Sequence, residues 1–79
     1  MIVLRNVTNE EIIVNGKLFR PSGMNDSEHQ VSKLDQLLWS ENSEVINLIS
    51  NQQLKLIHFG KAISDVNEAI NILKGTQKP

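Results

Sequence analysis

The spacing of apolar residues predicts a helix and then a strand in the second half of the chain. In the segment 43–51 the apolar residues fall at i, i+1, i+3 and i+4, which is one stripe of a helix. Asn42 or Ser43 can cap the first turn of this helix. The segment 54–59 alternates at first and is then apolar on both faces, which predicts a strand that ends at Gly60.

The closing helix has the clearest start and stop signals in the chain. Apolar residues recur at i, i+3, i+4 and i+7 over the segment 66–73. Asp65 and Glu68 form an Asp-x-x-Glu capping box before it, and Gly75 can take the left-handed position that ends a helix. Between strand and helix, 62–63 is expected to be a short extended link.

The first part of the chain predicts short strands that are joined by turns. Apolar residues at both odd and even positions, and so on both faces, indicate strands over 2–7, 11–14 and 17–20. The Asn-Gly pair at 15–16 is the strongest turn signal and suits a type I′ hairpin. We expect strand 2–7 to pair with strand 11–14, and segment 28–31 to return to the sheet.

A short helix is expected over 32–39, with Ser32 as its cap and Asp35 as a weak capping-box partner. Its leucines lie on one stripe: Leu34, Leu37 and Leu38. Trp39 lies roughly 140° round from Leu34 at about 100° per residue, and therefore outside that stripe.

Together these elements predict one α+β domain over 1–75 and a flexible C-terminal tail over 76–79. The fold class is a small antiparallel sheet of about four to five strands with three short helices. The strands are more apolar on both faces than a one-sided sheet requires. Either helices cover one face and strand twist mixes the parities, or part of the sheet is buried against another chain.

Composition narrows the classes of function. A chain of 79 residues buries only a small core, and without cysteine no disulfide can support it. An oligomer or a larger assembly would be a natural source of further stability. The net charge of −1 argues against strong non-specific binding to nucleic acid or to an anionic membrane. No apolar run reaches the roughly 18 residues of a spanning helix, and no signal peptide opens the chain.

The chain has no recognisable catalytic or metal-binding motif. A nucleophile–His–acid triad would need His29 or His58, and neither lies in a known motif. Asp26, Glu28 and His29 are close in sequence, but their spacing fits neither a calcium loop nor a zinc signature. We therefore expect no enzyme activity, no cofactor, no metal and no small-molecule substrate.

Two helices joined by a short link, 32–40 and 43–51, also allow a helix-turn-helix interpretation. Their charges oppose it, because the second helix carries Glu44 and no Lys or Arg, and the first has only Lys33 against Asp35. We expect no nucleic-acid partner.

Protein–protein contact is the class that remains. Trp39 and Phe59 are the best candidates for an interaction surface, because aromatic side chains bury a large area at low entropic cost. The alternative is that each of them caps the small core edge-on. Ile72 lies off the main stripe of its helix, which favours a second contact surface. The candidate interaction residues are Trp39, Phe59, His58, Phe19 and Ile72.

One pattern extends over most of the chain. It opens with Ile-x-Leu-x-Asn at 2–6, followed by Thr8 and a hairpin, and continues with the run 43–57. A glycine turn, the Ser-Asp pair at 64–65 and a closing helix that ends with Ile-Leu-Lys-Gly at 72–75 complete it. This pattern resembles small virion structural proteins of tailed bacteriophages. Those proteins have Asn-Asp-Gly at the turn after the strand.

At that turn this chain has His58, Phe59 and Gly60 instead, which marks Phe59 as a point where the protein has a partner of its own. The resemblance implies a role in capsid decoration, head–tail joining or attachment of fibres and tail parts. It implies other virion proteins as partners, a homo-oligomer or multi-copy assembly, and location in the virion after synthesis in the host cytoplasm. The alternative is a small soluble regulator or inhibitor that binds one host or phage protein.

Overall fold

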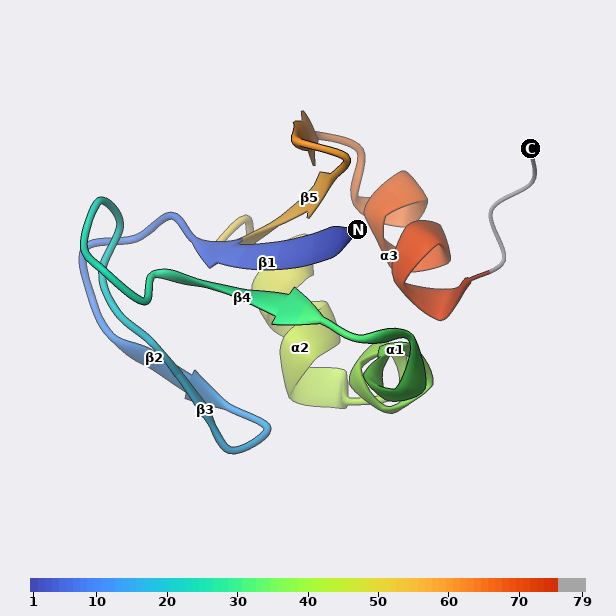
Figure 1. Ribbon diagram of the computed structural model, residues 1–79, viewed down its shortest axis with the longest axis horizontal. Coiled ribbons are helices and arrows are strands. Elements are labelled where there is room, and N and C mark those ends of the chain that lie inside the picture. The colour runs from blue at the N-terminus through green and yellow to red at the C-terminus, as the bar shows by residue number, and fades with distance from the viewer. Residues whose placement is uncertain (76–79) are drawn as a thin grey trace.

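Six strands and three helices make up residues 1–75, which are the residues that the computed structural model describes (Figure 1). The tail expected over 76–79 lies outside them. The elements are β1 (Ile2–Asn6), β2 (Ile12–Val14), β3 (Lys17–Phe19), β4 (Glu28–Val31), α1 (Lys33–Ser40), α2 (Ser43–Ser50), β5 (Leu54–His58), β6 (Lys61–Ile63) and α3 (Val66–Lys74). The predicted α+β class with an antiparallel sheet and three short helices is confirmed, although the strands are divided between a four-stranded and a two-stranded sheet.

The strands form two sheets, one with the order β4-β1-β5-β6 and one that contains β2 and β3. Strand β1 lies inside the larger sheet, where Leu4 is opposite His29 of β4 and Leu56 of β5. The expected pairing of β1 with β2 is wrong. Both edges of β1 are occupied by strands from far along the chain, so β2 pairs instead with β3 across the turn at 15–16.

A second correction concerns the segment after Gly60. The extended link expected at 62–63 belongs to strand β6, which pairs antiparallel with β5 and brings Lys61 opposite His58. Only Phe59 and Gly60 separate the two strands, so β5 and β6 form a hairpin with a two-residue loop.

The helices cover one face of the larger sheet, and in Figure 1 α2 passes behind β1 and β4. Alternate residues of β1 and β5 point into the core between the layers: Ile2, Leu4, Leu54 and Leu56. From the helices this core receives Trp39, Val45, Ile49, Ala69, Ile72 and Leu73. Val3 and Ile57 are register partners on the other face of the sheet and are also buried. The double-sided apolar pattern therefore corresponds to buried side chains on both faces.

Each helix begins at a side-chain cap, as the sequence predicts. The side chain of Ser32 accepts a hydrogen bond from the backbone N–H of Asp35, and Asp65 does the same for Glu68. Asn42 caps α2. Gly75 ends α3 with φ 75°, a left-handed conformation that glycine adopts without steric cost.

Asn6, at the end of β1, joins the two sheets. Its side chain is fully buried, and its amide nitrogen donates to the carbonyl oxygens of Glu10 at 2.7 Å, Arg20 at 3.0 Å and Phe19 at 3.3 Å. Its amide oxygen accepts hydrogen bonds from the backbone N–H of Thr8 at 2.8 Å and from the Thr8 hydroxyl at 2.7 Å. One side chain thus ties the start and the end of the β2–β3 hairpin to the central strand.

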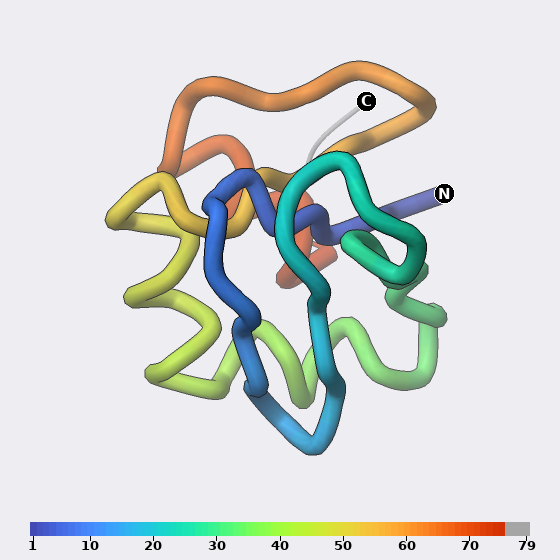
Figure 2. The backbone as a smooth tube through the Cα atoms, turned by 90° about the vertical axis from the view of Figure 1, so that its left-hand side faces the viewer, coloured from blue at the N-terminus to red at the C-terminus, as the bar shows by residue number. Residues whose placement is uncertain are grey.

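The hairpin that Asn6 anchors carries Phe19 into the core. Figure 2 shows this hairpin on the near side, with α1 behind its lower part and α2 along the left of the view. The Phe19 ring is fully buried and makes edge-on contacts with the rings of His29 and Trp39, at centroid distances of 4.7 and 6.2 Å. The small sheet therefore closes one end of the core.

Replacing Asn6 with alanine is expected to remove most of the stability of the fold. The substitution leaves buried carbonyl groups without a donor, and each such group costs about 1–3 kcal/mol. We expect the free energy of unfolding, measured by urea denaturation, to fall by about 3 kcal/mol or more. Asn67→Ala, at an exposed position of α3, is the control and should change it by less than about 0.5 kcal/mol. Equal effects of the two substitutions would contradict the proposed anchoring role.

Candidate interaction surface

Helix α1 turns its leucines away from the core. Leu34 is 89% exposed, Leu37 59% and Leu38 64%, whereas Trp39 is only 5% exposed. At about 100° per residue, the leucine stripe lies roughly opposite the side that carries Trp39 and Ser40. The interpretation of Trp39 as part of an exposed surface is wrong, because its ring fills the space beside Phe19.

Polar residues on the inward side of α1 have hydrogen-bond partners, which makes this orientation tolerable. The hydroxyl of Ser40 donates to the carbonyl oxygen of Leu37 at 2.7 Å. The Gln36 amide makes long hydrogen bonds to the carbonyl oxygens of Ile72 and Leu73 near the end of α3, at 3.5 and 3.4 Å. Among the described residues, every buried side-chain nitrogen and oxygen has a partner.

We define the leucine face as Leu34, Leu37 and Leu38 of α1. The sequence prediction identified the shared stripe but not that it faces outward. The sequence does contain a signal for this orientation. The short helix has two apolar sides, the leucine stripe and Trp39, and only one of them can face the core. Contiguous exposed apolar surface of this kind is typical of an interaction site.

Phe59 is a second apolar feature on the surface, at the turn between β5 and β6. Its side chain is 79% exposed, and its backbone is left-handed, with φ 51°. The turn at 15–16 has the same loop length and a similar φ of 53°, but there the residue is Asn15, which suits this conformation. Phe59 therefore occupies a strained position without burying its ring in the fold, as expected of a side chain that serves a contact.

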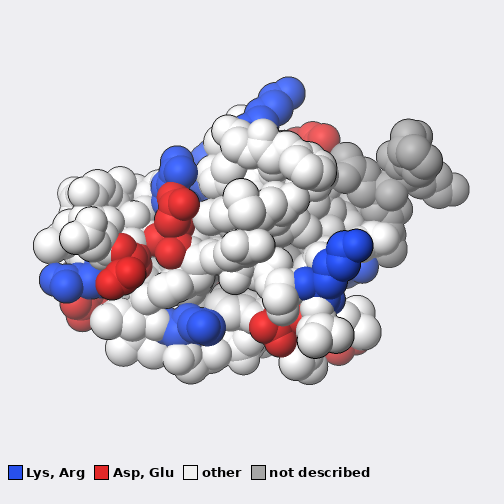
Figure 3. Space-filling model, in the orientation of Figure 1, with Lys and Arg blue, Asp and Glu red and all other residues white. Residues whose placement is uncertain are grey.

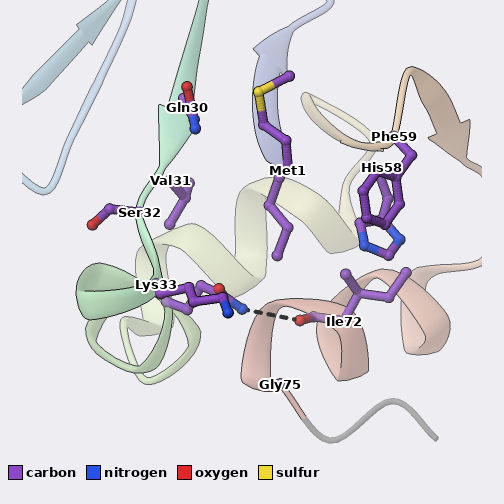
Figure 4. A pocket seen from close by; sticks show the side chains of 11 residues that line it. Met1, Gln30, Val31, Ser32, Lys33, His58, Phe59, Ile72 and Gly75 are labelled. Carbon is purple, nitrogen blue, oxygen red and sulfur yellow. Dashed lines mark hydrogen bonds between the residues drawn. The ribbon is translucent and has the colours of Figure 1, made fainter. Parts of the chain in front are cut away.

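A groove of about 420 Å³ lies beside Phe59, where the start of β1 meets the ends of β4, β5 and α3 (Figure 4). In that view Met1 lies between Val31 on one side and His58 and Phe59 on the other. The residues that line it are Met1, Ile2, Gln30, Val31, Ser32, Lys33, Gln36, His58, Phe59, Ile72 and Gly75. The groove is open and largely apolar, so it fits an apolar side chain of a partner.

Ionisable side chains are few in the described lining of the groove. Among the residues that the structure describes, Lys33 and His58 are the basic side chains of the lining, and no Asp or Glu belongs to it. The ring of His58 contacts that of Phe59 at a centroid distance of 4.5 Å, with the two ring planes tilted by 43°. Within residues 1–75 no three His, Cys, Asp or Glu side chains lie close enough to hold a metal ion.

The structure brings together three of the five predicted interaction residues. His58, Phe59 and Ile72 line the groove. Ile72 is only 3% exposed and belongs to the core, so the expectation that it lies off the core side of its helix is wrong. Phe19 and Trp39 lie in the core, which corrects their assignment to a surface. The interaction role of the other three stays a prediction.

The charged groups on the described surface are dispersed. On the face shown in Figure 3, basic and acidic side chains are interspersed between wide uncharged areas. Among the described residues, Arg5 Nε and Glu28 Oε1 form an ion pair at 2.7 Å. Over the described part of the chain, no helix is long and apolar enough to cross a membrane.

No protein-family model matches the chain, and no curated protein and no solved structure is significantly similar to it.

Because α1 buries Trp39 and exposes Leu34, substitutions at these two positions should differ strongly in their effect on stability. Trp39→Ala should lower the free energy of unfolding by about 3–5 kcal/mol, because it leaves a large cavity in the core. Leu34→Gln, in the same helix and of similar helix propensity, should change it by less than about 0.5 kcal/mol. Urea denaturation measures both. A large loss in Leu34→Gln would mean that the leucine face packs inward.

The strain at Phe59 predicts a stabilising substitution. Phe59→Asn places at φ 51° a residue that tolerates the left-handed conformation, and should raise the free energy of unfolding by about 1 kcal/mol. The matched substitution in the other hairpin, Asn15→Phe, should lower it by a similar amount. If Phe59→Asn were destabilising, the Phe59 ring would contribute to the fold and not to a contact.

Proposed function

We propose that the protein acts without catalysis, by protein–protein contact, as a structural component of a tailed-bacteriophage particle. The observation that carries the proposal is the leucine face, which exposes three large apolar side chains on a helix whose opposite side is buried. The assignment of the protein to a phage particle rests on the resemblance of its sequence pattern to small virion proteins.

The exposed leucine side chains contribute to stability only when another molecule covers them. Each Å² of apolar surface that leaves water contributes about 25 cal/mol, so three exposed leucines favour association over the free chain. A single contact of this size is weak, but a symmetric particle repeats it many times and makes the sum stable. A small domain that depends on its neighbours fits such a setting.

The groove beside Phe59 supports a second contact on the same protein. It lies between the ends of β1, β4 and α3, and among its described lining residues Lys33 carries a charge, on the side of the groove opposite His58 (Figure 4). A partner segment with an apolar side chain next to an acidic residue fits this lining. A component that joins particle proteins needs at least two contact surfaces, which the leucine face and the groove provide.

Association with intact particles is the direct test. Purified particles of the phage that encodes the chain, after banding in a density gradient, should contain the protein in many copies by quantitative mass spectrometry. Phe59→Asn, which removes the ring without harming the turn, and Leu34→Gln should each lower the copy number at least several-fold. Asn67→Ala should not change it. Absence of the protein from particles would overturn the proposal.

The groove also favours the alternative function, a small soluble regulator that binds one host or phage protein. In that case one soluble protein should bind with one-to-one stoichiometry, and Phe59→Asn should weaken that binding. The protein would then be found with its target in the soluble fraction and not with particles.

A further inference from the structure

The leucine face suits one partner in particular, a second copy of the chain. We propose that two copies of α1 pack antiparallel across a two-fold axis at Leu37, and so form a symmetric dimer interface. This inference rests on the proposed function only in taking the leucine face as a contact surface.

The charges at the ends of the leucine face are the first argument. Lys33 and Glu41 are each four residues from Leu37, so all three lie on one row along the helix. In an antiparallel pair centred on Leu37, Lys33 of one copy lies at the same level as Glu41 of the other, at both ends of the interface. A parallel pair would instead place like charges together.

Both charges are available for such a contact. Within the described residues neither Lys33 nor Glu41 makes an ion pair, and both are exposed. Asp35 differs, because its carboxylate accepts a hydrogen bond from the Ser32 hydroxyl at 3.1 Å and lies on the flank of the leucine stripe. The face thus carries one free cation and one free anion at equal distances from its centre, which makes it complementary to itself.

The leucines are also spaced for an antiparallel fit. With a rise of about 1.5 Å per residue, Leu34 lies about 4.5 Å before the axis and Leu38 about 1.5 Å after it. The Leu38 side chain of the second copy therefore falls between Leu34 and Leu37 of the first. This alternation lets the side chains of one helix fill the gaps of the other.

The size of the contact sets its strength. α1 has eight residues, and an interface built around one short helix falls below the roughly 1,200 Å² of stable complexes. We therefore expect a weak dimer in rapid exchange. The net charge of −1 adds little repulsion between copies.

Cross-linking tests the arrangement directly because the chain contains no cysteine. Leu37→Cys places two thiols across the proposed axis, and under mild oxidation it should form disulfide-linked dimers at least tenfold faster than the control. Asn67→Cys, at an exposed position of α3, is that control. Circular dichroism should show that both variants fold. Equal rates of cross-linking would overturn the proposal.

Charge exchange tests the orientation. In sedimentation equilibrium the natural chain should approach twice its mass of 8.9 kDa as concentration rises. Lys33→Glu should weaken the dimer about tenfold, because it replaces two ion pairs with two repulsions. Adding Glu41→Lys should restore the affinity, which a merely structural effect of either substitution would not do. A monomer at all concentrations, or no rescue, would overturn the proposal.

The two sets of experiments separate the two proposals. If the chain stays monomeric but Leu34→Gln still lowers its copy number in particles, the proposed function holds and another protein covers the leucine face. If the dimer forms but particles lack the protein, the interface is real and the proposed function is wrong.

Discussion

The fold depends on the buried amide of Asn6. Five hydrogen bonds from this one side chain hold the segments before and after the β2–β3 hairpin against the end of the central strand. A hairpin of two three-residue strands has little stability by itself. Because Asn6 fixes it beside the larger sheet, the hairpin can deliver Val14 and Phe19 to the core. A buried polar group with all its partners in place specifies one arrangement where apolar packing would allow several.

The position of Phe19 in turn decides the orientation of α1. The ring leaves a space that the indole of Trp39 fills, and one large aromatic residue buries more surface there than any single leucine could. Once Trp39 faces inward, the rigid geometry of the helix turns Leu34 and its neighbours outward. The exposed leucine face is thus a consequence of core packing on the opposite side of the same helix. The fold accepts it because the inward polar residues, Gln36 and Ser40, find backbone partners.

The surface of this small domain combines features that stability alone does not explain. The leucine face gives nothing to the core, and Phe59 holds a left-handed conformation with its ring in water. Burying either feature against another molecule would lower the free energy. On the face shown in Figure 3 the charges are dispersed, and within residues 1–75 no cluster of metal ligands is present.

The sequence by itself determined most elements of this fold, with strand β6 as the exception, because their signals are local. Caps such as Ser32 and Asp65 and the left-handed Gly75 fix helix ends through hydrogen bonds within one turn, and the Asn-Gly pair fixes one hairpin. The exposure of Phe59 could also be predicted, because its strand ends in a glycine turn. Tertiary structure alone decided the partners of β1 and the inward side of α1. Long-range strand pairing depends on which surfaces meet in space, and so does the choice between Trp39 and three leucines for the inward side of α1. The periodicity of apolar residues along the chain does not encode such contacts.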